Sequence, residues 1–394
     1  GKVLVNSNPT GAGKTLSWAA PAIRSGEDGE GWILMAMYPT NTLIEDQKET
    51  LLNLMERYFE SEKFKDKRNF NLIEKEGKKY LTDGERKYPL EDRVVEVTAD
   101  SSEESTGQQL KKAYDNAVEV YDIGLPTVIL TNPDIFTLLG SNRYRDRDIQ
   151  SLPGKLDKII VDEFHLSNPR GKRFLPFHLD LYKNLPDNSR LSDIVFLSAT
   201  PAPSYMSRIE SAFDAETVTR ETKPEEPVEG RKILPKAELH VSSREMFSNG
   251  EWLSDNIEVI KNFYSKSGQT LIILDSVNEV EELHETLEEE TGLDIRRIFG
   301  WKKEGRSEAV KNADILIGNT AVEVGVDFEE VNRLIFTAYD HASTIQRIGR
   351  MRAREDLEEY KIGMITKPET HAALLEDNQS GHISRDKFED IVYN

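Results

Sequence analysis

The sequence predicts two α/β domains in tandem, each a parallel β-sheet flanked by helices. Three observations support this fold class. Short, nearly continuous apolar runs rich in β-branched residues recur along the chain, helical patterns separate these runs, and 394 residues exceed the size of one ordinary domain. Because strands and helices alternate, a parallel sheet covered by helices is the favoured arrangement.

The first domain is expected over residues 1–220. Helical patterns such as 41–58 and 108–120 separate its predicted strands, which are Lys2–Val5, Ile33–Met37, Val94–Val97, Thr127–Leu130, Lys158–Val161 and Ile194–Leu197. The charged segment 61–88 interrupts this pattern with nine Lys or Arg and six Asp or Glu residues, a local excess of positive charge. It is either a solvated hairpin insertion or a contact surface for nucleic acid.

A linker is expected over residues 221–236, which are rich in Pro, Glu and Lys and lack apolar periodicity. The second domain is expected over residues 237–370. Its predicted strands are Glu238–Val241, Leu271–Leu274, Ile295–Phe299, Ile315–Ile317, Leu334–Thr337 and Lys361–Ile365. The pattern fades after Thr366, so residues 371–394 are expected to begin a further C-terminal element.

Composition narrows the class of protein. The chain has no cysteine, which excludes disulfides and cysteine–metal sites and fits a reducing cytoplasm. No apolar run approaches the roughly 18 residues of a membrane span, so we expect a cytoplasmic protein without membrane partners. The net charge of −20 is unusual for a protein that binds phosphate backbones, so any such binding requires a local basic groove.

A phosphate-binding loop is predicted between the first strand and the first helix. The run Asn8–Thr15 is rich in glycine and stands between a strand and a helical pattern. Glycines allow the backbone to wrap phosphates, and the helix N-terminus adds N–H donors. Lys14 would neutralise the phosphates of ATP, and Thr15 would ligate Mg²⁺. The remaining residues expected to bind the nucleotide here are Thr10, Gly11, Gly13 and Leu16.

A second constellation follows the strand predicted at Lys158–Val161. Asp162 and Glu163 are adjacent carboxylates at a strand end, which suits the other half of a nucleotide site. Asp162 would hold Mg²⁺, and Glu163 would position and activate the attacking water. His165 is expected to couple this site to the rest of the molecule.

These residues resemble the DExH box of superfamily-two helicases, and further stretches resemble the motifs of that superfamily in the same order. They are Tyr38–Gln47, Thr131–Asp134, Ser198–Thr200, Leu271–Ser276, Thr320–Asp327 and Gln346–Arg350. The resemblance implies two RecA-like domains with the ATP site in the cleft between them. It assigns catalysis to Gln346 and Arg350 beside Lys14, nucleotide binding to Asp327 and Arg347, and coupling to Ser198 and Thr200. Ala353 stands where the superfamily commonly has another arginine, which puts a second arginine finger in doubt, and Val324 stands where the family often has glutamine.

Contacts to nucleic acid are expected from hydroxyl and amide side chains that position a strand without reading its bases. These are Thr40, Asn41, Thr131, Asn132 and Thr320. A basic loop with one aromatic residue is either a grip on single strands or a solvated loop; it comprises Arg296, Arg297, Trp301, Lys302, Lys303 and Arg306.

Within the superfamily, the sequence is most similar to the signature helicase of type I CRISPR systems, with a leaning to subtype D. This likeness rests on three stretches: Tyr38–Gln47, Asp162–Leu166 and Leu197–Pro201. It implies ATP-dependent 3′→5′ movement on single-stranded DNA that a guide-RNA effector complex has opened. No histidine precedes an aspartate, so we expect the nuclease to be a separate subunit. The alternatives are another DExH helicase, for DNA repair or RNA, and a nucleic-acid-binding protein with an inactive ATP site.

Overall fold

The computed structural model divides the chain into two compact units, Gly1–Thr222 (unit 1) and Lys223–Asn394 (unit 2), which are described separately. The division falls inside the linker predicted at residues 221–236, of which only Lys236 is described. None of the described helices combines the length and apolar character that a membrane span requires. The structure describes residues 2–6, 13–29, 31–62, 64, 70–99, 104–141, 143–164, 169–183, 190–198, 203–213, 216–218, 236–245, 248–298, 313–319, 322, 328, 330–351, 354, 357, 359–377 and 381–393.

Unit 1 is built on a seven-stranded sheet in the order β10-β1-β9-β8-β2-β7-β6, and every described pairing in it is parallel. All six predicted strands are present. A short edge strand, β10, was not predicted. The strands are β1 (Lys2–Asn6), β2 (Ile33–Met37), β6 (Val94–Glu96), β7 (Thr127–Thr131), β8 (Lys158–Asp162), β9 (Asp193–Leu197) and β10 (Glu216–Val218).

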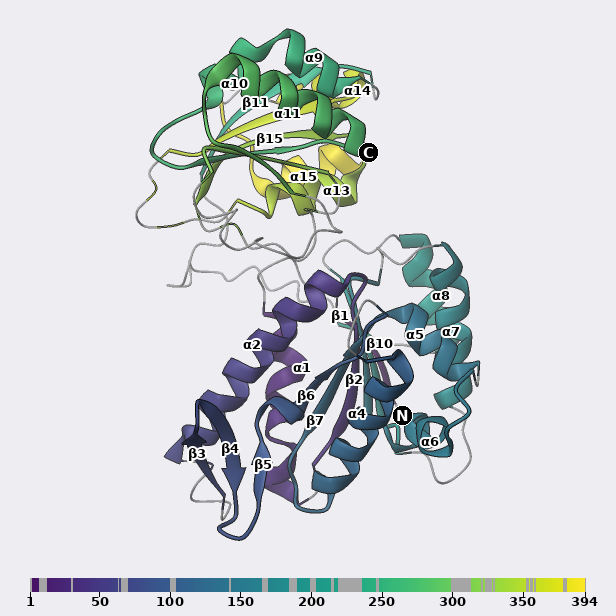
Figure 1. The fold of residues 1–394 in the computed structure, drawn as a ribbon. Coiled ribbons are helices and arrows are strands. Elements are labelled where there is room, and N and C mark those ends of the chain that lie inside the picture. The colour runs from purple at the N-terminus through teal and green to yellow at the C-terminus, as the bar shows by residue number, and fades with distance from the viewer. Residues whose placement is uncertain are drawn as a thin grey trace. The chain divides into compact units, whose positions relative to one another are not determined.

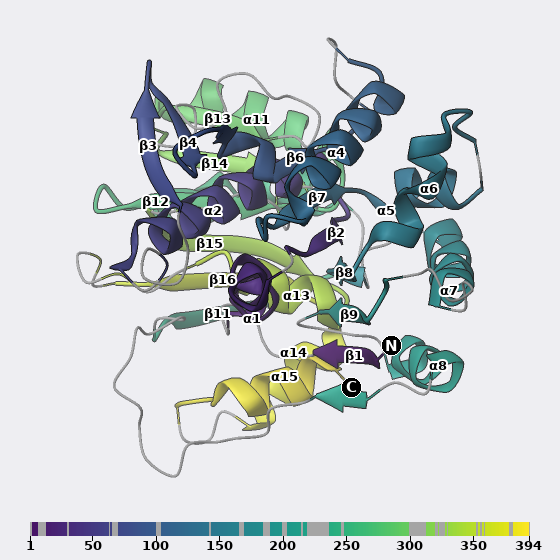
Figure 2. The same ribbon diagram turned by 90° about the horizontal axis from the view of Figure 1, so that it is seen from below.

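Helices cover both faces of this sheet, because successive residues of each strand point to opposite faces. Two separate apolar cores result. Figures 1 and 2 show α1 (Lys14–Ile23) and α2 (Asn41–Glu60) on one face. The helices on the other face are α4 (Thr106–Tyr121), α5 (Pro133–Gly140), α6 (Arg147–Lys155), α7 (Pro169–Lys183) and α8 (Pro203–Phe213). Two short 3-10 helices, Ser25–Asp28 and Glu91–Arg93, join elements of this unit.

The charged segment 61–88 contains a small antiparallel sheet of its own. Its strands are β3 (Asn71–Lys75), β4 (Lys78–Thr82) and β5 (Lys87–Pro89), in that order. Leu81 and Tyr88 are buried in the core that also contains Phe59 of α2. The predicted hairpin insertion is therefore present and packs on α2, whereas a contact of this segment with nucleic acid stays a prediction.

Unit 2 is built on a second all-parallel sheet of six strands in the order β11-β16-β15-β12-β14-β13. The predicted strands are again present, and β15 is longer than predicted. The strands are β11 (Glu238–Ser243), β12 (Gln269–Ile273), β13 (Ile295–Ile298), β14 (Ile315–Gly318), β15 (Val331–Ala338) and β16 (Lys361–Thr366). The helices on one face are α9 (Asn249–Asp255), α10 (Ile257–Phe263) and α11 (Val277–Thr291).

The last part of the chain differs from expectation. Residues 371–394 were expected to begin a further element, but they belong to unit 2. Leu374 of α14 (Pro368–Asp377) and Phe388 of α15 (Arg385–Tyr393) are buried in the same core as Ile345 of α13 (His341–Ile348). These helices therefore complete the cover of one face of the unit 2 sheet. The sequence does not reveal this role, because polar residues separate the few apolar residues of these two helices.

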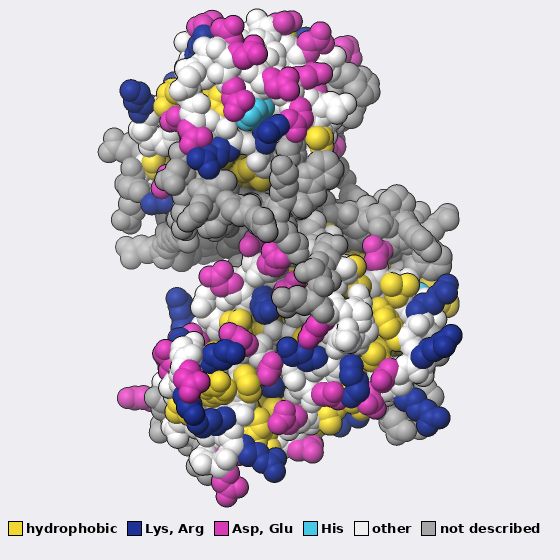
Figure 3. Space-filling view, in the orientation of Figure 1, with side chains coloured by type: hydrophobic (Ala, Val, Ile, Leu, Met, Phe, Trp, Pro, Cys, Tyr) yellow, Lys and Arg dark blue, Asp and Glu magenta, His cyan; other side chains and the backbone are white. Residues whose placement is uncertain are grey.

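The negative charge of the chain is concentrated on part of its surface. Helix α11 carries seven glutamates and no lysine or arginine. Figure 3 shows many Asp and Glu side chains on the surface of unit 2, on the side that its helices cover. Because a phosphate backbone is repelled by such a surface, this face of unit 2 is unsuited to nucleic acid.

Candidate functional site

Helix α1 begins at Lys14, directly after Gly13, whose backbone lies in the left-handed region at φ 78°. Glycine adopts this conformation without strain because it has no Cβ. The Lys14 ammonium is buried, has no hydrogen-bond partner among the described residues and lies 3.6 Å from a carboxylate oxygen of Glu163. Thr15 is half-buried, and Leu16 is 52% exposed. A buried ammonium at a helix N-terminus is suited to a phosphate group.

Two adjacent carboxylates face Lys14 at the carboxyl end of β8. Asp162 is 8% exposed, and the N–H of Glu163 donates to its Oδ1 at 2.9 Å. Glu163 itself has φ 45°, a left-handed conformation that is uncommon for residues other than glycine. Such backbone conformations persist where the surrounding structure enforces them, often at functional sites.

The electrostatics of this cluster suit a bound cation. Burial and, to a smaller extent, the neighbouring Glu163 raise the pKa of Asp162 to about 7, although Lys14 opposes both effects. A divalent cation would offset the cost of two close, buried carboxylates. Hard oxygen donors such as Asp162 and Thr15 are the ligands that Mg²⁺ prefers. The residues present therefore fit a magnesium–nucleotide, with Lys14 toward its phosphates.

Several predicted site residues lie outside the described residues: Thr10, Gly11, His165, Thr200, Thr320 and Asp327. Ser198 is described and follows β9, the strand paired with β8. It is fully buried, and its N–H donates to the Asn6 carbonyl at 3.1 Å. Ser198 therefore lies beside the ends of both β1 and β8, where the coupling role expected for it is sterically reasonable.

The residues predicted to contact nucleic acid in unit 1 have structural roles as well. Thr40 caps α2 by accepting the Leu43 N–H at 3.3 Å, and Asn132 caps α5 by accepting the Ile135 N–H at 2.9 Å. Asn41 is the first residue of α2. The two helices start at the same edge of the sheet, because β2 and β7 are parallel neighbours.

The Thr131 side chain has a structural role, and a contact of this residue with nucleic acid stays a prediction. Its side chain is fully buried, and its hydroxyl donates to the Val97 carbonyl at 3.0 Å. The hydroxyl therefore ties β7 to the segment after β6 rather than facing a phosphate. The sequence does not reveal this because a threonine at a strand end suits either role.

In unit 2, α13 carries the residues of the last predicted motif. Asp340 caps the helix by accepting the Ser343 N–H at 2.9 Å. Gln346 is 5% exposed. Arg350 lies in the turn that ends the helix, and its N–H donates to the Arg347 carbonyl at 3.0 Å.

The predicted basic loop is described only in part. Arg296 pairs with Asp294, and Arg297 pairs with Glu281. The other residues of the loop lie outside the described residues: Trp301, Lys302, Lys303 and Arg306.

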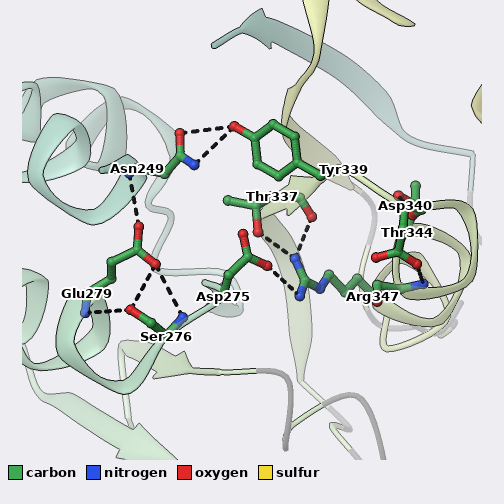
Figure 4. Close-up of polar contacts among 10 residues, drawn as sticks. Asn249, Asp275, Ser276, Glu279, Thr337, Tyr339, Asp340, Thr344 and Arg347 are labelled. Carbon is green, nitrogen blue, oxygen red and sulfur yellow. Dashed lines mark hydrogen bonds and ion pairs between the residues drawn. The ribbon is translucent and has the colours of Figure 1, made fainter. Parts of the chain in front are cut away.

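Arg347 is bound within unit 2. It is 2% exposed, and its guanidinium donates to the carbonyl and hydroxyl of Thr337 and to Asp275 Oδ1, the last at 3.0 Å. Figure 4 shows this guanidinium between Thr337 and Asp275. This geometry gives Arg347 a structural role, and the nucleotide contact expected for it stays a prediction.

Two polar residues of these sites were not singled out in the sequence. Asp275 follows β12, and the Ser276-x-x-Glu279 capping box after it marked a strand-to-helix turn that was open to detection. Tyr38 follows β2 next to Asp162, because Met37 is in register with Val161. The Tyr38 hydroxyl is buried without a hydrogen-bond partner among the described residues, and burial and Asp162 raise its pKa.

Comparisons with known proteins agree with this organisation. Residues 255–354 match the model of the helicase conserved C-terminal domain, and no curated protein matches the chain. The structure of S. cerevisiae Dbp5 bound to RNA and ADP BeF3 is similar, with a TM-score of 0.58 and 15% identity, over 99% of this chain and 88% of that one.

Two larger proteins are also similar. Mycobacterium smegmatis helicase Lhr bound to ssDNA and AMP-PNP gives a TM-score of 0.60 at 19% identity, over 97% of this chain and 46% of that one. Escherichia coli DEAH/RHA helicase HrpB gives 0.56 at 15% identity, over 94% and 41%. The chain thus spans less than half the length of these two proteins. The two parallel sheets and these likenesses show the tandem RecA-like fold that the sequence predicted, and the matched domain gives residues 255–354 a likeness to helicases.

Proposed function

We propose that the chain is an ATP-driven motor that moves 3′→5′ along single-stranded DNA. The observation that carries this proposal is the cluster of Lys14, Asp162 and Glu163 at one edge of the unit 1 sheet. A buried ammonium without a hydrogen-bond partner, a buried carboxylate with a raised pKa and a left-handed backbone meet there. Each is costly in the free protein, and a magnesium–nucleotide would compensate the first two.

The chemistry follows from the positions of these groups. Phosphoryl transfer needs positioning and charge neutralisation more than covalent chemistry. Lys14 would bind the terminal phosphates, Thr15 and Asp162 would hold Mg²⁺, and Glu163 would accept a proton from the attacking water. Mg²⁺, when bound, would neutralise charge on the phosphate oxygens. The sequence motifs add Gln346 and Arg350 of unit 2 as donors to the charge that develops on the phosphate.

The nucleic-acid track is assigned to the edge of unit 1 where α2 and α5 begin. Helix N-termini present N–H groups that bind phosphates without reading bases. Thr40 and Asn132 fix the two termini as caps, and the parallel pairing of β2 with β7 brings them to one edge. A nucleic-acid track across the face of unit 2 that α11 covers is disfavoured, because the glutamates of α11 repel phosphates.

The biological setting is proposed from the sequence alone. The likeness to the signature helicase of type I CRISPR systems favours a guide-RNA effector complex as the loading partner, a nuclease acting in trans and a cytoplasmic location. The same likeness is the reason for proposing that the motor moves on DNA rather than on RNA. Relatives with this fold differ here, since Dbp5 is described with RNA and Lhr with ssDNA. Another DExH helicase, for DNA repair or RNA, is the alternative.

The test is ATP turnover by the purified chain with Mg²⁺ and no polynucleotide, single-stranded DNA or single-stranded RNA. We expect DNA to give the largest stimulation and Lys14→Ala to abolish turnover. Lys112→Ala is the matched control, because it removes an exposed lysine from α4 of the same unit. Turnover by Lys14→Ala at the wild-type rate would overturn the assignment, and stimulation by RNA alone would favour the alternative.

The proposed CRISPR setting, with its separate nuclease and effector complex, is tested by a second experiment. The purified chain should leave single-stranded DNA uncut in the presence of Mg²⁺, Mn²⁺, Ni²⁺ or Co²⁺. It should bind DNA more tightly when a guide-RNA effector complex has opened the target. Metal-dependent cleavage by the chain alone contradicts a nuclease in trans, and indifference to the effector complex contradicts the CRISPR setting without affecting the motor assignment.

A further inference from the structure

The turn between β12 and α11 brings a carboxylate to the helix that carries the predicted transition-state residues. Asp275 lies in this turn, and its Oδ1 is 3.0 Å from the Arg347 guanidinium of α13. We propose that Asp275 is a positioning residue for ATP hydrolysis, which fixes α13 through Arg347 and thereby orients Gln346 and Arg350. This inference rests on the proposed function, because it assigns these two residues to the nucleotide.

The first support is the way Arg347 is held. Thr337 lies in β15, the neighbour of β12 in the sheet, and both its carbonyl and its hydroxyl accept from the Arg347 guanidinium. Asp275 accepts from the other terminal nitrogen. A planar guanidinium held at two nitrogens by two strands has little freedom to rotate. The helix is therefore anchored to the middle of the sheet at Arg347.

The second support is charge. Arg347 is 2% exposed, and a buried guanidinium is costly unless an anion is close. Asp275 supplies that anion. Its Oδ2 is buried and has no hydrogen-bond partner among the described residues, so the carboxylate depends on Arg347 for its own compensation. Neutralising Asp275 would therefore loosen the anchor while leaving the packing of the helix nearly unchanged.

The position of Asp275 is itself fixed from the other side, as Figure 4 shows. Ser276 caps α11 and forms a capping box with Glu279. The other oxygen of Glu279 accepts the N–H groups of Asn249 at 3.0 Å and Gly250 at 3.3 Å at the start of α9. The turn that carries Asp275 is thus bound to two helices on the opposite face of the sheet.

The same network reaches the start of α13. The Asn249 amide donates to the Tyr339 hydroxyl at 3.0 Å, and Tyr339 precedes Asp340, the cap of α13. Arg347 anchors the last turn of the helix. Gln346 comes one residue before this anchor and Arg350 three residues after it, so a rotation of α13 would displace both. A misplacement of about 1 Å can cost on the order of 100-fold in rate.

The test compares two aspartates that each pair with an arginine in unit 2. Asp275→Asn removes the buried charge with little change of shape, and Asp294→Asn removes the partner of Arg296 in an exposed pair of similar length, 2.9 Å. We expect Asp275→Asn to lower kcat for DNA-stimulated ATP hydrolysis by about 10-fold to 100-fold, with KM for ATP and binding of a fluorescent ADP analogue within about twofold. Asp294→Asn should change none of these values.

A mutant cycle shows whether Asp275 acts through the proposed residues. In a background that carries both Gln346→Ala and Arg350→Ala, Asp275→Asn should cause little further loss, because both groups that it orients are already missing. Multiplication of the two losses would mean that Asp275 acts elsewhere. If Asp275→Asn does not fold, Thr337→Val is the second variant; it removes one acceptor of Arg347 and should give the same kcat effect in weaker form.

A readout independent of activity separates this inference from the proposed function. Hydrogen exchange of the α13 amides should be faster in Asp275→Asn than in the wild type, and unchanged in Asp294→Asn. An inactive wild-type chain would overturn the proposed function. An active wild type whose kcat and α13 exchange are matched by a folded Asp275→Asn would overturn the positioning role of Asp275.

Discussion

In unit 1, the Lys14 ammonium is buried without a hydrogen-bond partner among the described residues, and Asp162 has a pKa raised to about 7. In unit 2, the buried Arg347 guanidinium is bonded to Thr337 and Asp275. Both clusters follow the carboxyl ends of parallel strands and contain charges removed from water. One is poorly compensated within the protein, and the other is compensated by its own unit.

This difference indicates a division of labour. Buried charges that lack full compensation cost stability and persist where a ligand repays the cost. Buried charges that satisfy each other cost less and fix geometry instead. The contrast supports the proposal that unit 1 binds a nucleotide, whereas unit 2 holds a helix rigid. The comparison predicts that substitutions in the two clusters affect binding, rate and stability in different proportions.

The largest effect is expected for Arg350→Ala in unit 2. An arginine that acts on transition-state charge contributes on the order of 10³-fold or more to the rate. We expect kcat for ATP hydrolysis to fall by that amount while binding of a fluorescent ADP analogue is kept, because the nucleotide is held by unit 1. Arg296→Ala, which removes an exposed arginine of the same unit, is the control. Loss of nucleotide binding in Arg350→Ala would contradict the division of labour.

The next effect is expected for Glu163→Gln in unit 1. A glutamine keeps the size of the side chain but cannot accept the proton of the attacking water, and removal of such a base costs roughly 10²- to 10⁴-fold. Single-turnover kinetics should show a slow hydrolysis step, and ATP should still bind. Weaker binding together with an unchanged hydrolysis step would mean that Glu163 holds the ligand rather than activating water.

The sequence predicted the sheets better than the side-chain contacts. Apolar runs such as Ile33–Met37 give the strands directly, because a strand buried on both faces has no polar residues. The Lys14 and Asp162 clusters were predictable for a similar reason, since parallel strands deliver their carboxyl ends to one edge. The contacts of Arg347 and Thr131 could not be predicted, because a polar residue beside a site serves equally well as a ligand contact or as a bond within the fold. Their partners, Asp275 and Val97, are known only from the structure.

A smaller effect, on stability, is expected for Arg347→Met. The substitution leaves Asp275 without its cation, and loss of one partner of a fully buried pair costs about 3–5 kcal/mol. We expect about 2 kcal/mol, because the Asp275 side chain is 32% exposed and water reaches it in part. Urea unfolding should show the loss, and hydrogen exchange should place it in α13 and β15. Arg296→Met, which breaks an exposed pair, should cost less than about 1 kcal/mol.

The smallest effect is expected for Asp162→Asn, which should raise rather than lower the stability of the nucleotide-free protein. The pKa of Asp162 is raised to about 7, so the folded protein keeps a proton there that the unfolded chain has released at its ordinary pKa of 3.8. Its contribution to stability is present below the unfolded value and is lost as the pH rises through about 7. At pH 8 the charged carboxylate therefore destabilises the nucleotide-free protein. Asp162→Asn removes this charge.

We expect Asp162→Asn to stabilise the nucleotide-free protein at pH 8 by at least about 1 kcal/mol, since one pKa unit corresponds to about 1.4 kcal/mol and the raised pKa of about 7 already includes the attraction to Lys14. In a protein of this size the melting temperature should rise by roughly 2–4 °C. The gain should shrink as the pH falls and disappear below the ordinary pKa of 3.8, where Asp162 is protonated in both states. Asp193 is the control in the same sheet: burial raises its pKa and the Lys158 hydrogen bond lowers it, with a net downward shift. Asp193→Asn should therefore lose stability at pH 8. A loss at pH 8 in Asp162→Asn as well would mean that unit 1 already compensates its carboxylate, and the contrast between the two units would disappear.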